Sequence, residues 1–275
     1  MIRQKRVVVI NDLSGLGKCS LTVSISILSA LNIQPCPIPT AILSNQTQFN
    51  EYSFYDFTNN MKDYIRIWEK QKEKFDAIYT GFLGSYNQID IILEFIKKQR
   101  DTLIIVDPVM GDNGEIYETY NKDMCNKMKE LVSLSYIVTP NITEACILAD
   151  EKLDIENLTN DYLKRLGKKI ASIGPKYVII TGIINKNKIS NVLYDKEKNE
   201  IYRITTKFNN TSYSGTGDIF ASMLTALILN NNSVYKSMEI TTNFISKAIQ
   251  YTNKFNIDPN YGIYYEKFLR EVIIQ

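Results

Sequence analysis

The 275-residue sequence contains no histidine. This absence excludes Ser-His-Asp and Cys-His catalysis, zinc sites of the H-E-x-x-H type and proton shuttles that use imidazole. Any catalysis must therefore depend on carboxylates, backbone amides, lysines or a metal held by oxygen ligands.

Cysteine is scarce as well. The four cysteines, Cys19, Cys36, Cys125 and Cys146, are widely separated and form no C-x-x-C pair. This spacing favours buried, reduced thiols over a disulfide scaffold or a zinc knuckle.

Long apolar runs at the amino terminus and an excess of one charge sign are also absent. Only four apolar residues separate Arg6 from Asn11, too few for a secretory or membrane-spanning segment, so we expect a cytoplasmic protein. Lys and Arg total 32 against 30 for Asp and Glu, which gives no long-range attraction to nucleic acid or to an anionic membrane. We expect neither of these as a partner.

Short runs rich in Val, Ile and Tyr alternate with longer segments of mixed polarity. This alternation predicts an α/β fold with a mostly parallel central sheet and helices on both of its faces. The expected strands are 7–10, 77–80, 103–106, 137–139 and 177–181. The expected helices are 16–31, 52–74, 88–98, 121–134, 162–173, 217–228, 234–251 and 264–273. Segments 189–193 and 201–206 predict an antiparallel hairpin, and the absence of a repeat or linker predicts one domain over residues 1–275.

The most informative segment is 214–230, SGTGDIFASMLTALILN, in which a turn of small residues precedes an apolar helix. Gly215 and Gly217 let backbone amides approach a ligand, and a helix amino terminus favours an anion such as phosphate. Asp218 beside that site is suited to take a proton from an attacking hydroxyl. The structural alternative is that Ser214 caps the helix and Asp218 only complements its dipole.

Two further loops follow expected strands. Asp107 opens the loop DPVMGDNG, which predicts either a site for phosphate-bound Mg²⁺ or a plain turn. The segment TPNITEA, 139–145, places Pro140 and Glu144 in the first turn of a helix, so Asn141 and Glu144 form either a cap or a ligand pair for metal, water and phosphate. Beside the turn at Ser214, we favour the ligand pair, because ligands of open α/β sheets lie beyond the carboxyl ends of the strands.

Two polar segments near the amino terminus complete the candidates. The run SNQTQF, 44–49, suits hydrogen bonding to a neutral polar molecule, or is a solvated loop. Residues 11–18, NDLSGLGK, are not a P-loop, because Asp12 replaces the first glycine of that motif and Cys19 follows Lys18.

Taken together, these segments resemble the pyridoxal/pyridoxamine kinase family of the ribokinase-like superfamily. The resemblance runs from Val7 to about Leu269. It is carried by SNQTQ (44–48), GFLGS (81–85), DPVMGD (107–112), TPNITEA (139–145) and GTGD (215–218). It implies a ribokinase-like three-layer α/β fold and ATP-dependent phosphorylation of the 5′-hydroxymethyl group of pyridoxal, pyridoxamine or pyridoxine. The resemblance implies ATP and Mg²⁺ as cofactors and a homodimer as the assembly. Whether a monovalent cation is also required is left open.

The resemblance also implies roles for individual residues. Asp218 is the implied base and contacts the substrate, and the amides of Gly215, Thr216 and Gly217 stabilise the transferring phosphoryl group. The implied residues for Mg²⁺ and ATP phosphates are Asp107, Asn141 and Glu144, with Asp107 and Glu144 nearest the metal and Thr181 along the nucleotide. The implied pyridine-binding residues are Asp12, Thr47, Gln48 and Phe82.

Three substrate-side residues differ from the common family pattern. Many members have Ser where Asp12 stands, His where Gln46 stands and Tyr where Phe82 stands. The nearest alternative within the superfamily is a hydroxymethylpyrimidine kinase of thiamine synthesis, because its substrate is also a small aromatic ring bearing a CH₂OH group. A sugar or nucleoside kinase is less well supported, because the diglycine typical of that branch is missing. A non-catalytic nucleotide-binding protein with the same fold is the alternative from another functional class.

Overall fold

A computed structural model describes residues 3–273 of the chain. Within these residues the main sheet has nine strands in the order β11-β10-β9-β8-β5-β4-β1-β2-β3. The strands are β1 (Arg6–Leu16), β2 (Gln34–Asn45), β3 (Phe54–Asp56), β4 (Ala77–Thr80), β5 (Leu103–Val106), β8 (Ile137–Val138), β9 (Tyr177–Asn185), β10 (Lys188–Asp195) and β11 (Glu200–Lys207). The six strands from β2 to β9 pair in parallel, and β3, β10 and β11 pair antiparallel at the edges.

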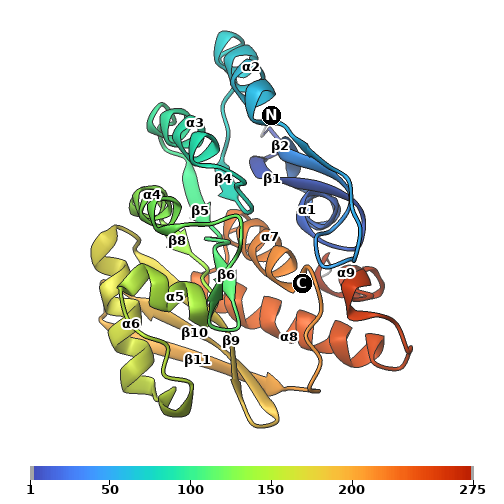
Figure 1. Ribbon diagram of the computed structural model, residues 1–275, viewed down its shortest axis with the longest axis vertical. Coiled ribbons are helices and arrows are strands. Elements are labelled where there is room, and N and C mark those ends of the chain that lie inside the picture. The colour runs from blue at the N-terminus through green and yellow to red at the C-terminus, as the bar shows by residue number, and fades with distance from the viewer. Residues whose placement is uncertain (1–2, 274–275) are drawn as a thin grey trace.

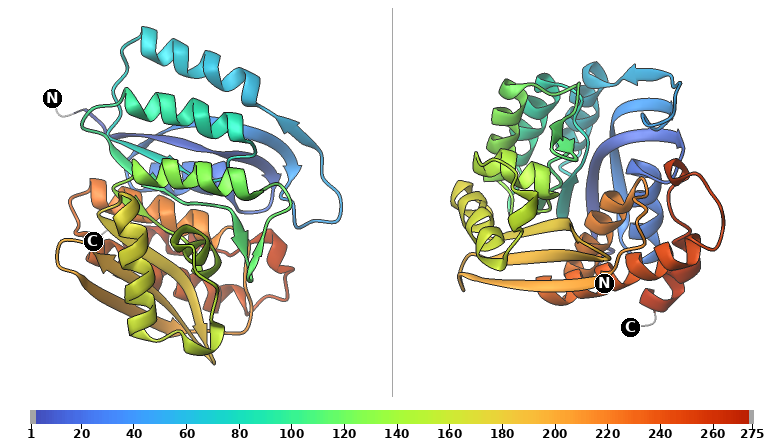
Figure 2. Two further views of the ribbon diagram at one scale, coloured as in Figure 1. Left: turned by 60° about the vertical axis from the view of Figure 1, so that its left-hand side comes forward. Right: turned by 60° about the horizontal axis from the view of Figure 1, so that its bottom comes forward.

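Helices cover both faces of this sheet (Figures 1 and 2). One layer holds α2 (Thr58–Lys70), α3 (Tyr86–Lys97), α4 (Lys122–Ser133), α5 (Ile142–Ala149) and α6 (Asn160–Ile173). The other holds α1 (Ser20–Ala30), α7 (Thr216–Leu229), α8 (Val234–Thr252) and α9 (Leu269–Ile273). Alternate residues of β1 serve the two layers, because Val8 and Ile10 join one buried core while Val7 and Val9 join the other. The three-layer α/β prediction is confirmed.

Several element boundaries differ from the sequence-based predictions. Leu16 ends β1 instead of opening a helix, and the predicted helix 52–74 begins at Thr58, after the short edge strand β3. β2 was not predicted as a strand. The predicted final helix 264–273 is a 3₁₀ turn, Glu266–Phe268, followed by the short α9. The hairpin prediction is confirmed by β10 and β11, and a second small hairpin joins β6 (Gly111–Asp112) to β7 (Glu115–Ile116).

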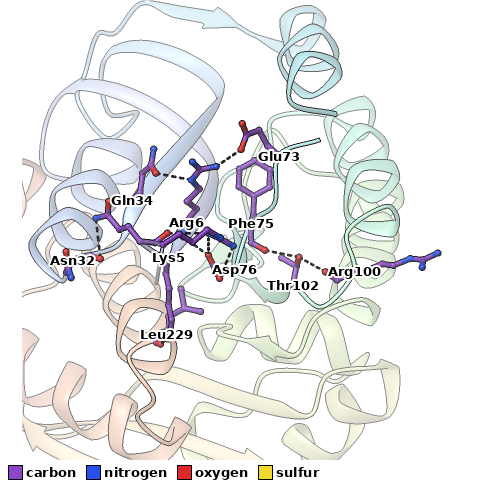
Figure 3. Close-up of polar contacts among 12 residues, drawn as sticks. Lys5, Arg6, Asn32, Gln34, Glu73, Phe75, Asp76, Arg100, Thr102 and Leu229 are labelled. Carbon is purple, nitrogen blue, oxygen red and sulfur yellow. Dashed lines mark hydrogen bonds and ion pairs between the residues drawn. The ribbon is translucent and has the colours of Figure 1, made fainter. Parts of the chain in front are cut away.

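A polar cluster joins the amino ends of β1, β2 and β4 (Figure 3). The Arg6 backbone N–H donates to Asp76 at 2.7 Å, while its guanidinium donates to Gln34 at 3.1 Å and pairs with Glu73. These contacts close the end of the sheet at which parallel strands begin. The opposite end, where the strands stop at short polar loops, is free to form a ligand site. No helix within residues 3–273 has the length and apolar character needed to cross a membrane.

Candidate active site

The amino terminus of α7 is built around Gly215. This residue is the N-cap, has φ 76°, and makes no side-chain capping bond. An added Cβ would lie 1.8 Å from the carbonyl oxygen of Lys18, so only glycine fits. The suggested capping role of Ser214 is therefore wrong. The amides of Thr216, Gly217 and Asp218 begin the helix and need partners from outside it. This arrangement supports an anion site at the turn.

Asp218 lies in the first turn of α7 and is held by donors from three other elements. Its Oδ1 accepts hydrogen bonds from Asn11 Nδ2 at 2.8 Å and from the Tyr79 hydroxyl at 3.4 Å. Its Oδ2 accepts one from the Ser20 backbone N–H at 2.8 Å. The residue is partly exposed, so it is not sealed within packed hydrocarbon. Oδ2 accepts one hydrogen bond and Oδ1 accepts two, so Oδ2 retains a lone pair that can receive a proton.

The surroundings of Asp218 tune its basicity. The pKa of its carboxyl is raised to about 6, mainly by burial and to a smaller extent by the charge of Asp12, while the donors from Ser20 and Asn11 oppose the shift. A carboxylate with a pKa near 6 is largely ionised at neutral pH and is a better base than an exposed aspartate. This value suits general base catalysis.

Asp107 faces the start of α7 from the end of β5. It is 9% exposed, and its Oδ1 accepts a hydrogen bond from Thr139 Oγ1 at 3.2 Å. Its Oδ2 lies 3.7 Å from the position that a Cβ on Gly217 would occupy. Burial and the charge of Asp218 raise the pKa of the Asp107 carboxyl. The structure thus brings together two acidic side chains and the glycine turn, as predicted.

Asn141 and Glu144 form a capping box at the start of α5. Asn141 is the N-cap and Glu144 is the third helical residue, so Pro140 precedes the helix and does not lie in its first turn as predicted. Glu144 accepts the Asn141 N–H at 2.8 Å and the Met110 N–H at 3.1 Å, and Asn141 Nδ2 donates to the Gly111 carbonyl at 2.8 Å. The pair therefore ties α5 to the loop that Asp107 opens.

The same acidic groups could hold a cation together with a phosphate ligand. Within residues 3–273 no group of three or more Cys, Asp or Glu side chains could bind a metal unaided, and no ion pair reaches Asp12, Asp107, Glu144 or Asp218. Burial and the charge of Asp107 raise the pKa of Glu144 well above its usual range. Uncompensated carboxylates fit a divalent ion that takes one or two protein oxygens and completes its shell with water and phosphate.

Thr181 joins this region from the end of β9. Its N–H donates to the Pro140 carbonyl at 2.9 Å, and it pairs with Asn141 in an isolated parallel bridge. Gly182 follows with φ 68°, and a Cβ added to it would have no neighbouring atom within 4 Å. Thr181 is thus adjacent to the capping box, where the resemblance expects the nucleotide.

The predicted substrate residues divide into two groups. Asp12 is buried and accepts bonds from Ser20 Oγ at 2.6 Å and Ser14 Oγ at 2.8 Å, which leaves lone pairs free on both oxygens. Phe82 is partly buried next to the Asn11 side chain, since its N–H donates to Asn11 Oδ1 at 2.9 Å. Asp12 and Phe82 therefore lie near Asp218, and their contact with a pyridine ring stays a prediction.

Thr47 and Gln48 lie on an exposed turn after β2, apart from that group. Gln46 anchors the turn by donating from Nε2 to the Asn260 carbonyl at 3.2 Å and by accepting the Gln48 N–H at 2.9 Å. Asn260 Nδ2 in turn donates to the Gln48 carbonyl at 3.3 Å. The turn is fixed at its base, and its substrate role stays a prediction.

Sequence reasoning missed three residues that contact Asp218: Asn11, Ser20 and Tyr79. In the sequence Asn11 is only the first residue of the polar segment 11–18, and nothing there links it to Asp218. Tyr79 lies in a predicted strand with no motif around it, and Ser20 contacts Asp218 through its backbone N–H, which no side-chain motif indicates. The positive φ of Ser20, 51°, is visible only in the structure.

Comparisons with known proteins bear on this site. A family model described as Phosphomethylpyrimidine kinase matches residues 25–264. A hydroxymethylpyrimidine/phosphomethylpyrimidine kinase of Bacillus subtilis (strain 168) is 30% identical over 180 residues, 64% of this chain and 64% of that protein. A pyridoxine kinase of the same organism is 30% identical over 178 residues, again 64% of each. The chain thus spans slightly under two thirds of the length of these relatives.

A solved structure covers more of the chain. A Bacteroides thetaiotaomicron VPI-5482 protein assigned as a phosphomethylpyrimidine kinase, crystallised with pyridoxal, is 38% identical with a TM-score of 0.94 and covers 98% of this chain and 96% of its own. The resemblance inferred from the sequence motifs is confirmed at the level of family and fold.

Proposed function

This chain belongs to the phosphomethylpyrimidine kinase family, and we propose from this premise that it transfers the γ-phosphoryl group of ATP to the hydroxymethyl group of a small aromatic alcohol. The observation that carries the proposal is the position of Asp218. A partly buried carboxylate of raised pKa lies in the first helical turn, beside amides that need external partners. A protein that only binds nucleotides needs the amides and has no use for the base.

Each residue of the candidate site has a separate role in the proposed reaction. Asp218 takes the proton of the attacking hydroxyl, and the amides of Gly215, Thr216 and Gly217 stabilise charge on the transferring group. Asp107 and Glu144 would hold Mg²⁺, and the ion would supply positive charge to the phosphate oxygens. Asn141 and Thr181 would lie along the nucleotide. Most of the rate then comes from positioning and electrostatics, because phosphoryl transfer needs little covalent help.

Within this class we propose pyridoxal, pyridoxamine or pyridoxine as the acceptor, phosphorylated on the 5′-hydroxymethyl group. The Bacteroides neighbour crystallised with pyridoxal supports this choice. Hydroxymethylpyrimidine or its phosphate is the second candidate, favoured by the Bacillus relative of that name and by the family description. Asp12 can accept a hydrogen bond from a protonated ring nitrogen or a ring hydroxyl, and Phe82 can stack on either ring.

Location and assembly belong to the same proposal. From the family likeness we infer a cytoplasmic homodimer. From the near-neutral charge we infer that neither nucleic acid nor a membrane is a partner. Light scattering after gel filtration would contradict the dimer if it gave the 31.6 kDa mass of one chain.

The deciding experiment measures ADP release with ATP, Mg²⁺ and five alcohols: pyridoxal, pyridoxamine, pyridoxine, hydroxymethylpyrimidine and ribose. Release with the three pyridines supports the proposal. Release with hydroxymethylpyrimidine alone supports the second candidate, and release with ribose supports a sugar kinase. No release with any alcohol would leave the non-catalytic binder as the better description.

A further inference from the structure

Asn11 connects the candidate base to the substrate side of the site. It lies in the middle of β1, directly before the register with β2 shifts, and it is 1% exposed. Its side chain makes three hydrogen bonds, to β1 itself, to the loop after β4 and to α7. These three segments carry Asp12, Phe82 and Asp218.

The direction of the Asn11 amide is fixed by its partners. Its Oδ1 accepts the backbone N–H groups of Asp12 at 3.0 Å and Phe82 at 2.9 Å. Because both of these groups can only donate, the oxygen must face them and Nδ2 must face Asp218. The amide therefore presents a donor to Asp218 Oδ1 at 2.8 Å in a single orientation.

Gly81 leaves the space that this amide occupies. A Cβ on Gly81 would lie 2.4 Å from Asn11 Nδ2 and 2.9 Å from its Oδ1. The side chain is thus confined on one side by the Gly81 backbone and on the other by the Asp218 carboxylate. This confinement restricts rotation of the Asn11 side chain, so its Nδ2 holds the Asp218 carboxylate in one position.

From this geometry we propose that Asn11 is a positioning residue for phosphoryl transfer: its Nδ2 fixes Asp218 Oδ1, which leaves Oδ2 to receive the substrate proton. This inference rests on the proposed function. The bond to Oδ1 orients the carboxylate plane, while Ser20 N–H holds Oδ2 from the start of α1. Because Asn11 also holds the Phe82 N–H, it sets the spacing between the base and the wall on which the ring would stack.

The variant Asn11→Asp tests this role with little change of shape. Its retained oxygen still accepts the N–H groups of Asp12 and Phe82, but its second oxygen replaces the donor that faces Asp218. We expect kcat to fall by about 10²-fold, the scale of a misplaced catalytic group, with the KM for ATP unchanged. The double variant Asn11→Asp/Asp218→Asn should be no slower than Asp218→Asn alone, because Asn11 acts through Asp218.

A matched control is Gln88→Glu, another exchange of a buried amide for an acid. Gln88 is 1% exposed, and its Nε2 donates to the Thr40 carbonyl and to Thr58 Oγ1, both at 2.8 Å. Its amide ties α3 to β2 and contacts none of the candidate catalytic groups. We expect this variant to lower the thermal unfolding midpoint while keeping kcat.

The outcomes separate the inference from the proposed function. If the wild-type chain phosphorylates an alcohol and Asn11→Asp keeps its kcat, Asn11 has no positioning role and the proposed function stands. If the double variant is much slower than Asp218→Asn, Asn11 acts on catalysis by another route and the inference is wrong. If the wild-type chain phosphorylates none of the five alcohols, the proposed function fails and the role of Asn11 falls with it.

Discussion

Asp218 is the single side chain on which turnover should depend most. Its replacement by Asn keeps the size of the side chain but removes the base, so we expect kcat to fall by roughly 10² or more, with little change in ATP affinity. Steady-state ADP release and nucleotide titration measure the two quantities separately. Near-normal turnover in Asp218→Asn would refute the assigned role.

Asp195→Asn is the matching control. Asp195 is 5% exposed and caps the β10–β11 turn by accepting the N–H groups of Glu197 and Lys198. Replacing this buried carboxylate should lower the free energy of unfolding. It should leave kcat unchanged, because no candidate catalytic residue contacts Asp195.

The pH dependence of turnover should also report Asp218. Burial raises the pKa of this carboxyl to about 6, and the base must be ionised to accept a proton. We therefore expect kcat/KM to be constant above about pH 7 and to fall as the pH drops through about 6. A profile that stays flat down to pH 5, with the protein still folded, would contradict this assignment.

Alanine substitutions at two glycines with positive φ should differ in their cost to stability, because only one of the added Cβ atoms would clash with a neighbouring atom. Gly182 has φ 68° and open space around it, so Gly182→Ala should cost only the left-handed backbone, about 1–2 kcal/mol. Gly215 has φ 76°, and its added Cβ would lie 1.8 Å from the Lys18 carbonyl oxygen. Gly215→Ala should therefore lower the free energy of unfolding by clearly more than Gly182→Ala in urea titrations. Equal losses would mean that the turn can move away from Lys18.

At the scale of elements, the sequence predicts what has strong periodicity. The apolar runs of β4, β5 and β9 and the amphipathic pattern of α6 were predicted within a few residues. β2 was missed because three of its residues are proline, which lacks the N–H expected in a central strand. The start of α1 was misplaced because β1 continues through a polar segment to Leu16.

The candidate site was predictable where it depends on motifs and unpredictable where it depends on contacts. Asp107, Asn141, Glu144 and Asp218 follow strands or open helices, and such positions meet at one end of a parallel sheet. The contacts of Asn11 with Asp218 and of Gln46 with Asn260 span more than 200 residues of chain. Pairings of this kind depend on tertiary packing, which periodicity and spacing do not encode.

The segment 258–262 makes tertiary contacts with three parts of the candidate site. Its Pro259 carbonyl accepts the Ser214 N–H at 3.2 Å, and its Tyr261 carbonyl accepts the Lys18 N–H at 3.2 Å. Asn260 bonds to the turn that carries Thr47 and Gln48. The segment thus connects the predicted substrate turn to the residue before Gly215, at the start of the turn for which phosphate binding is proposed.

Truncating Asn260 should therefore affect the acceptor more than the nucleotide. In Asn260→Ala the Gln48 carbonyl loses its donor while the backbone contacts of Pro259 and Tyr261 remain. We expect a higher KM for the aromatic alcohol, an unchanged KM for ATP and a nearly unchanged kcat, measured by ADP release. Asn230→Ala is the control, because Asn230 Nδ2 donates to the Leu31 carbonyl at 3.1 Å from the carboxyl end of α7. A rise in the KM for ATP in Asn260→Ala would place the turn on the nucleotide side.

At the scale of the whole molecule, the site places several acidic groups together without basic partners. Burial raises the pKa values of Asp12, Asp107, Glu144 and Asp218. These carboxyls keep their protons to a higher pH in the folded chain than in the unfolded chain, where they titrate near 4. Proteins tolerate such groups at functional sites because the rest of the fold supplies the compensating free energy.

This imbalance predicts that the ligand-free protein loses stability as the pH rises from about 4 through 6 and beyond. In that range the folded state binds more protons than the unfolded state, so the free energy of unfolding falls with pH. No histidine titrates there to mask the effect. Arg165 and Lys169 lower the pKa of the Glu151 carboxyl to about 2, so its opposite contribution is confined to pH values from about 2 up to its usual pKa of 4.5, mostly below the pH values tested here. Urea midpoints at pH 5, 6, 7 and 8 measure the slope. Because a cation bound at the acidic groups favours their ionised forms, adding Mg²⁺ with a nucleotide should flatten it. A stability that rises from pH 5 to 8 without ligand would show that the acidic groups are already compensated in the free protein.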